Sequence, residues 1–316
     1  MSADPINKSA DELLEKLRSK WDSKTPNWRV VELLAVMSEN AYLSEKEASN
    51  AFHSLGFRRV CPVKAKVGEA SMEGYVVSLM NAAVIVFRGT DEPWDWAVSF
   101  DHTWCYIPHG KIHRGFCNAY HSASQSENSL RSQVLTLLCE RLPEHLWITG
   151  HSLGGALALV CAYDLEENRQ TMKIELKGVL TFGQPMVVDM KLATRVNQLL
   201  SNRYTYFVNG RDIVPRLPPR YVPLLSDHYV HCGWGIWFRD GVVKFLQPEV
   251  TVAYGRSDER DAEDALLPLS EEEFEQLKDS LRREIGVFRG NVPWISDHSI
   301  REYIEQIRRF LQGRIL

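Results

Sequence analysis

"LWITGHSLGGALAL", residues 146–159, decides the fold prediction, because a strand-like run enters a Gly-His-Ser-Leu-Gly turn and a helix-forming run leaves it. A serine at the tip of so tight a turn adopts a strained backbone conformation, and side chains two residues to either side would collide with it. Gly150 and Gly154 remove those side chains. The stretch therefore predicts that Ser152 stands above the end of a sheet, with the first amides of the next helix aimed at the same point.

Short, nearly continuous apolar runs recur along the chain, with helix-like segments between them. They read EGYVVSL, AAVIVFRG, LWITG, GVLTFG and YTYFVNG. This alternation predicts an α/β fold, with a central, mostly parallel β-sheet that helices cover on both faces. Sites in such folds form at the carboxyl ends of the strands. We expect one domain over residues 1–316, with helices in residues 1–55.

Composition and charge exclude several classes of function. The formal net charge is -4 and the basic residues are scattered, so nucleic acid is not an expected partner. No apolar run approaches the roughly twenty residues that span a bilayer, so we expect no transmembrane segment. The first residues have no apolar core typical of a signal peptide, which favours a cytoplasmic location.

The cysteines do not indicate a metal site. Six are spread along the chain without a C-x-x-C pair or paired histidine spacing, so neither a metal nor an organic cofactor is expected. Cys105 and Cys117 are near enough in sequence to meet, but free thiols in a reducing compartment are the favoured interpretation.

A nucleophilic serine needs a base within hydrogen-bond reach and an acid that orients the base. In α/β-hydrolases they follow in the order Ser, acid, His, which leaves His228, His231 and His298 of the ten histidines. His298 precedes an amphipathic helix with a Ser299/Glu302 capping box, which would hold its side chain firmly. The other two follow a proline-rich loop, where a histidine is more often part of the packed structure.

Two aspartates are candidates for the acid. Asp212 stands just past the YTYFV run and its NG turn, where a carboxylate would project into the site. Asp189 comes after the GVLTFG run, but the longer stretch QPMVV separates it from that run. Aspartate is also common in turns because it bonds to nearby backbone groups. We favour Asp212.

Together the motifs resemble the class 3 lipase family, the fungal-type α/β-hydrolases, from about residue 30 to residue 310. The similar pieces occur in the family's order and read LLAVMSENAY, VIVFRGT, KIHRGF, ITGHSLGGALA, TFGQP, FVNGRDIVPRLPP, YVHCGW and SDHSIREY. The resemblance implies that Ser152 is the nucleophile, Asp212 the acid and His298 the base. It also implies an oxyanion hole formed by the backbone N–H groups of Leu153 and Thr90.

The resemblance implies a serine carboxylester hydrolase, foremost a lipase that cleaves acylglycerol esters through an acyl-enzyme. Its substrate would be a lipid or small ester, met in transient contact with a lipid interface. Three alternatives remain: a phospholipase A1, a short-chain or feruloyl-type esterase, and a lipase-like binding protein without turnover.

Two segments differ from the family or have no clear counterpart in its pattern. Residues 91–110 occupy the position of the family's lid, and Trp94, Trp96 and Phe100 alternate there with polar or small residues. These aromatic side chains are candidates for lid or substrate contact, or simply for core.

The second segment is a helical insertion over residues 254–290. It contains a Ser270/Glu273 capping box ahead of an apolar stripe. An amphipathic helix packed on the body is favoured over a cap that shapes the acyl pocket.

Overall fold

The structure is a computed structural model. It describes residues 5–67, 70–90, 103–122, 128–169, 174–218, 228–248 and 296–313, together with the single positions 270, 272, 273, 275, 276 and 279. The helices are α1 (Pro5–Arg18), α2 (Trp28–Asn40), α3 (Glu45–Ser54), α5 (Arg114–His121), α6 (Leu130–Arg141), α7 (Leu153–Glu167), α8 (Met190–Leu200) and α11 (Ile300–Leu311). The strands are β1 (Arg59–Val67), β2 (Ala70–Leu79), β3 (Ala82–Phe87), β4 (Trp104–Ile107), β5 (Gly110–His113), β6 (His145–His151), β7 (Glu175–Phe182), β8 (Val188–Asp189), β9 (Tyr204–Asn209), β10 (Tyr229–Val230), β11 (Trp234–Arg239) and β12 (Val242–Leu246).

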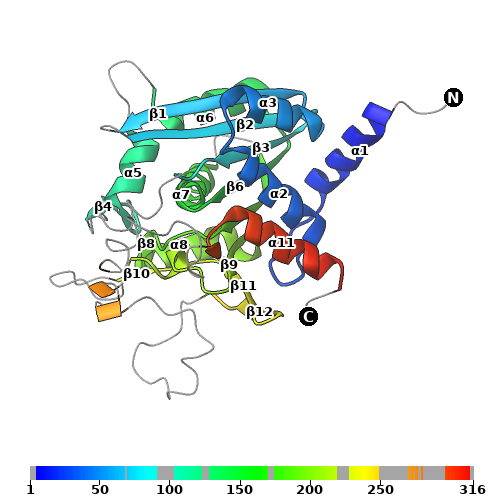
Figure 1. Ribbon diagram of the computed structural model, residues 1–316. Coiled ribbons are helices and arrows are strands. Elements are labelled where there is room, and N and C mark those ends of the chain that lie inside the picture. The colour runs from blue at the N-terminus through cyan, green and yellow to red at the C-terminus, as the bar shows by residue number, and fades with distance from the viewer. Residues whose placement is uncertain are drawn as a thin grey trace.

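The main sheet has eight strands in the order β1-β2-β3-β6-β7-β9-β11-β12 (Figure 1). Strands β3, β6, β7, β9 and β11 run parallel, whereas β1, β2 and β12 pair antiparallel at the two ends. The five expected apolar runs all lie in this parallel centre or in the adjacent β2. The prediction of a mostly parallel α/β sheet is confirmed, and β1 is a strand that the sequence analysis did not predict.

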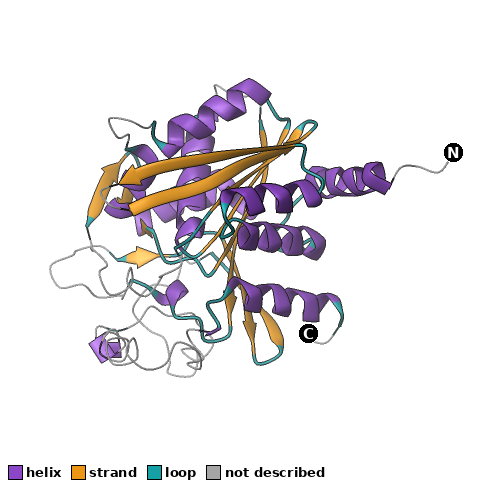
Figure 2. Cartoon of the chain, turned by 45° about the horizontal axis from the view of Figure 1, so that its top comes forward, coloured by secondary structure: helices purple, strands orange, loops and turns teal. Residues whose placement is uncertain are grey.

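The buried centre of the sheet separates two cores, because successive side chains of a strand point to opposite faces. On β3, Ile85 belongs to the hydrophobic cluster that includes buried residues of α5, α6, α7 and α8. Val84 and Val86 belong to the cluster that includes buried residues of α1, α2, α3 and α11. Figures 1 and 2 show α1, α2 and α11 side by side on the second face. Helix α7 lies on the first face, against β3, β6 and β7. Both faces of the parallel strands are therefore covered, as their apolar sequences require.

The N-terminal segment is bound into the sheet by polar contacts. The indole N–H of Trp147, in the middle of β6, donates to the carbonyl oxygen of Leu17 at 2.8 Å. The Ser23 hydroxyl donates to the carbonyl oxygen of Asn202, next to β9, at 2.5 Å. These buried groups would otherwise lose their hydrogen bonds to water, so the contacts fix α1 and the following turn on this face.

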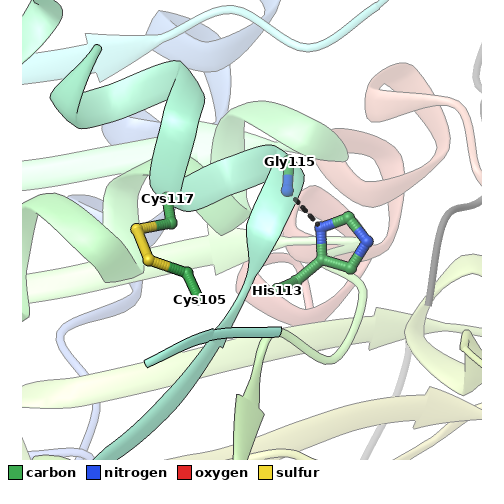
Figure 3. Close-up of a disulfide and its surroundings, with 4 residues drawn as sticks. All are labelled: Cys105, His113, Gly115 and Cys117. Atoms are coloured by element: carbon green, nitrogen blue, oxygen red, sulfur yellow. Dashed lines mark hydrogen bonds between the residues drawn. A yellow bond between two sulfur atoms is a disulfide. The ribbon is translucent and has the colours of Figure 1, made fainter. Parts of the chain in front are cut away.

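A disulfide, shown in Figure 3, joins the smaller sheet β10-β8-β5-β4 to α5. The β4–β5 hairpin of this sheet pairs Cys105 with Ile112, and Cys117 follows in the first turns of α5. The Cα atoms of Cys105 and Cys117 are 6.4 Å apart, within disulfide range, and the two residues are joined. The expectation of free thiols is therefore wrong for this pair, because hairpin register rather than sequence spacing brings the cysteines together. Four cysteines are free: Cys61, Cys139, Cys161 and Cys232.

One of the two expected capping boxes forms. The Ser270 amide donates to the Glu273 carboxylate at 2.7 Å, and the Glu273 amide donates to the Ser270 hydroxyl at 3.1 Å. Ser299 is the N-cap of α11, but its side chain makes no capping bond, so the predicted Ser299/Glu302 box is wrong. The Glu302 amide instead donates to the Ser299 carbonyl oxygen at 3.0 Å, which already satisfies it.

Several predicted features lie outside the described residues or have a different structure from the one expected. Trp94, Trp96 and Phe100 lie outside the described residues, as does most of the insertion 254–290. Residues 104–107 of the expected lid segment are strand β4. Among the described residues, no helix is long and apolar enough to cross a bilayer, and no cluster of three potential metal ligands occurs.

His231, one of the three candidate bases, belongs to the packed interior. Its ring stacks on Tyr206 with the centroids 4.3 Å apart, and Nε2 donates to the carbonyl oxygen of Pro215 at 2.7 Å. Burial lowers the pKa of His231 to about 4, because a charged ring would lose its hydration. The side chain is therefore a neutral, structural histidine near pH 7.

Cysteine titration checks the disulfide. In denaturant we expect four reactive thiols before reduction and six after it, because Cys105 and Cys117 are joined. The Cys105→Ser/Cys117→Ser double variant should give four in both conditions. Six thiols in the unreduced wild type would contradict the pairing.

The buried His231 predicts a pH dependence of stability. The folded protein protonates this ring near pH 4, whereas the unfolded chain protonates it near 6.5, so the unfolded state binds more protons between these values. This contribution to stability is present above pH 6.5 and is lost as the pH falls toward 4, by roughly 3 kcal/mol. His231→Gln keeps an N–H for the Pro215 carbonyl and should flatten the fall in unfolding free energy. Urea unfolding of the wild type and of His231→Gln between pH 6.5 and about pH 4 tests this prediction. An equal fall in unfolding free energy in the two proteins would contradict it.

Candidate active site

The turn between β6 and α7 carries Ser152 in the strained conformation that its neighbours require. Its φ is 57° and its ψ is -128°, a region that non-glycine residues rarely adopt. A Cβ at Gly150 would collide with the Gly154 carbonyl, and a Cβ at Gly154 would collide with the carbonyl oxygen of Phe87 on β3. The two glycines therefore let α7 begin directly against the ends of β6 and β3.

Ser152, His298 and Asp212 form one hydrogen-bonded chain. The His298 Nε2 lies 2.9 Å from the Ser152 Oγ. The His298 Nδ1 lies 2.9 Å and 3.0 Å from the two carboxylate oxygens of Asp212. All three residues are at least 97% buried, which keeps bulk water from competing for the bonds. The arrangement can move a proton from the hydroxyl to the imidazole while the carboxylate orients the ring.

The three residues meet at the carboxyl ends of the parallel strands. Ser152 follows β6 and Asp212 follows β9. His298 precedes α11, which packs against α2 and β9. Between them lies Gly183, after β7, with φ 58°; a Cβ there would lie 2.9 Å from an Asp212 carboxylate oxygen and 3.1 Å from the His298 ring. The end of β7 must therefore be glycine for the acid and the base to meet.

Two further donors hold the Asp212 carboxylate. The Tyr303 hydroxyl donates to Oδ2 at 2.6 Å, and the Val214 amide donates to Oδ1 at 2.9 Å. Burial raises the pKa of Tyr303 well above its usual value, and the nearby Asp212 charge adds to this, so the hydroxyl keeps its proton. The carboxylate is thus fixed from both sides before it meets the imidazole.

The proposed oxyanion donors flank the serine. Leu153 is the first residue of α7 and is buried, so its amide belongs to the helix N-terminus, which favours negative charge. On the other side, a Cβ at Gly89 would lie 3.1 Å from the Ser152 Cβ and 2.7 Å from the His151 carbonyl oxygen. Thr90 follows Gly89, so the end of the β3 segment lies beside Ser152.

The alternative candidates have other contacts. The Asp189 carboxylate caps α8 by accepting from the Leu192 amide at 2.9 Å and also accepts from the Lys111 amide at 3.0 Å. His231 is in the core described above, and His228 lies just before β10. The histidine in contact with Ser152 is His298.

Arg88 and His113 make structural contacts. Arg88 pairs with Glu73 at 3.2 Å. The His113 ring accepts from the Gly115 amide at 3.1 Å and caps α5 (Figure 3).

Sequence reasoning missed three residues that contact the site. Tyr303 lies on α11, for which the sequence predicts only an amphipathic helix. His151 and Tyr42, which contact each other at 2.8 Å, had no individual role. A tyrosine in an otherwise buried apolar stripe needs a partner for its hydroxyl, and that was the available signal for Tyr303.

Known proteins share this fold and resemble parts of this chain. The family model described as lipase (class 3) matches residues 84–222. A triacylglycerol lipase from Arabidopsis thaliana is 35% identical over 193 residues, covering 48% of this chain and 37% of that protein. A chloroplastic phospholipase A1 from the same plant is 28% identical over 207 residues, covering 54% and 39%.

The lipase of Rhizomucor miehei is 33% identical over 168 residues, covering 52% of this chain and 43% of that protein. A solved structure of a Rhizomucor miehei triacylglyceride lipase aligns with a TM-score of 0.52 at 25% identity, over 67% of this chain and 81% of that chain. The chain thus spans less than half the length of the curated relatives it matches. The α/β-hydrolase fold is confirmed, and so is the resemblance to the class 3 lipases, whose family model matches residues 84–222.

Proposed function

We propose that this protein is a serine carboxylester hydrolase that acts on lipid esters. The observation that carries the proposal is the buried chain Ser152–His298–Asp212 at the end of a strained strand-to-helix turn. The class 3 lipase match supports the same chemistry.

In the proposed reaction, His298 Nε2 takes the Ser152 proton as the hydroxyl oxygen attacks the ester carbonyl carbon. The Nδ1–H of the resulting imidazolium donates to Asp212, whose negative charge stabilises it. The amides of Leu153 and Thr90 stabilise the oxyanion. The carbon–oxygen bond to the alcohol breaks as the alcohol takes the proton from Nε2. Water then gives a proton to His298 Nε2 as its oxygen attacks the acyl carbon. The bond from that carbon to the Ser152 Oγ breaks as Oγ takes the proton back from Nε2, which releases the carboxylic acid and the free serine.

Apart from the substrate and water, these reaction steps use only side chains and backbone amides of the protein. The imidazole handles each proton, and amide dipoles meet the negative charge that a metal ion meets in other hydrolases. We therefore propose a reaction without a metal or organic cofactor.

We propose an acylglycerol as the foremost substrate, since two of the relatives above are named lipases and one of these is a triacylglycerol lipase. A phospholipid is the second candidate, since another relative is named a phospholipase A1. Initial rates on triolein and on phosphatidylcholine, both in mixed micelles, separate them: a higher rate on triolein supports the first and a higher rate on phosphatidylcholine the second.

Ester hydrolysis and covalent labelling test the activity. We expect the wild type to hydrolyse p-nitrophenyl esters and to react with a fluorophosphonate probe, whereas Ser152→Ala should do neither, because the attacking oxygen is absent. A long-chain optimum favours a lipase and a short-chain optimum an esterase. A folded wild type without labelling or turnover would contradict the proposal and favour a binding protein.

The choice of acid gives a second prediction with a matched control. Asp212→Asn should lower kcat by about 10³- to 10⁴-fold, because the amide no longer stabilises the imidazolium or its tautomer. Asp189→Asn makes the same chemical change at the α8 cap, where an asparagine oxygen still accepts from the Leu192 amide, and should leave kcat near wild type. Equal losses in the two variants would contradict the assignment.

A further inference from the structure

His151 is a buried titratable residue that contacts the triad without belonging to it. It is the last residue of β6 and directly precedes Ser152, with 5% of its surface exposed. Its Nδ1 is 2.8 Å from the Tyr42 hydroxyl, and its Nε2 is 2.7 Å from the backbone carbonyl oxygen of His298. The proposed mechanism uses neither contact.

The hydrogen bonds assign the tautomer of this ring. A carbonyl oxygen only accepts, so the His151 Nε2 carries the hydrogen and donates to His298. Burial lowers the pKa of His151 well below its usual value, so the ring is neutral and its Nδ1 is an acceptor. The Tyr42 hydroxyl therefore donates to Nδ1, and this bond favours the tautomer that donates to His298.

Tyr42 and His151 also contact the end of the β3 segment, which carries the proposed oxyanion donor Thr90. Tyr42 follows α2, and the Arg88 guanidinium lies 5.8 Å from its ring centroid. A Cβ at Gly89 would collide with the Tyr42 hydroxyl, so the end of the β3 segment lies directly on this group. The His151 and His298 rings pack together with centroids 4.7 Å apart. The pair thus touches the β3 end, the nucleophile turn and the histidine loop at once.

We propose that Tyr42 and His151 are positioning residues, which hold the backbone and ring of His298 in register with Ser152. The inference rests on the proposed function and deepens it. His298 comes from a loop 146 positions after Ser152, and Asp212 orients its ring at only one edge. The His151 bond to the carbonyl oxygen supplies a second fixed point on the same residue, and together the two points determine where Nε2 meets the hydroxyl.

The test compares variants by the rate of fluorophosphonate labelling and by kcat and KM. Tyr42→Phe and His151→Leu should each lower the labelling rate and kcat by about 10- to 100-fold through misplacement of the base, with KM changed less than about twofold. His151→Gln should recover most of the rate, because a glutamine N–H can reach the His298 carbonyl. The double variant Tyr42→Phe/His151→Leu should be little slower than His151→Leu, since both changes break one chain of bonds.

Ser38→Ala is the matched control for a purely structural effect. Ser38 lies one turn before Tyr42 and bonds to Thr149, two residues before His151, at 3.1 Å. It should lower the Tm but leave the labelling rate unchanged.

Wild-type labelling rates in folded Tyr42→Phe and His151→Leu would overturn the inference, as would an equal loss of rate in Ser38→Ala or no recovery in His151→Gln. If His151→Leu does not fold, the labelling rates of Tyr42→Phe and His151→Gln still test the positioning role. A folded wild type that is not labelled overturns the proposed function itself, so the two failures are distinguishable.

Discussion

The structure of the site depends on one close approach, that of Gly154 to the carbonyl oxygen of Phe87. No side chain fits between them, so the first turn of α7 lies against the end of β3. This contact brings a helix N-terminus, with its partial positive charge, beside the segment that carries Thr90. The strain at Ser152 is a consequence, because the chain has to reverse within one residue to reach that position. The covered parallel sheet supplies the rigid support that maintains such a conformation.

The sequence predicts the parts of this arrangement that local chemistry determines. Gly150 and Gly154 around Ser152 define the turn, and apolar runs define the parallel strands. Chain order and the surroundings of each candidate lead to Asp212 and His298, which the structure brings into contact with each other and, through His298, with Ser152. These inferences need only spacing, residue type and the rule that sites form at the carboxyl ends of strands.

The features that the sequence does not predict depend on contacts between distant segments. The pairing of Cys105 with Cys117 requires the hairpin register, and the bond from Tyr303 to Asp212 joins residues 91 positions apart. The contact of Tyr42 with His151 spans 109 positions. Side-chain periodicity shows that such residues are buried but not which polar groups they meet. The Ser299/Glu302 box failed for a local reason, because a backbone carbonyl had already satisfied the amide that the serine would cap.

The order of the site residues along the chain has a consequence for biosynthesis. Ser152 and Asp212 leave the ribosome well before His298, which lies just before α11, and α11 packs against α2 and β9. A growing chain can complete the strained turn and the parallel strands while the proton acceptor is still missing. Under the proposed mechanism, Ser152 therefore lacks its base during synthesis and gains it only when the last described helix packs on one of the first.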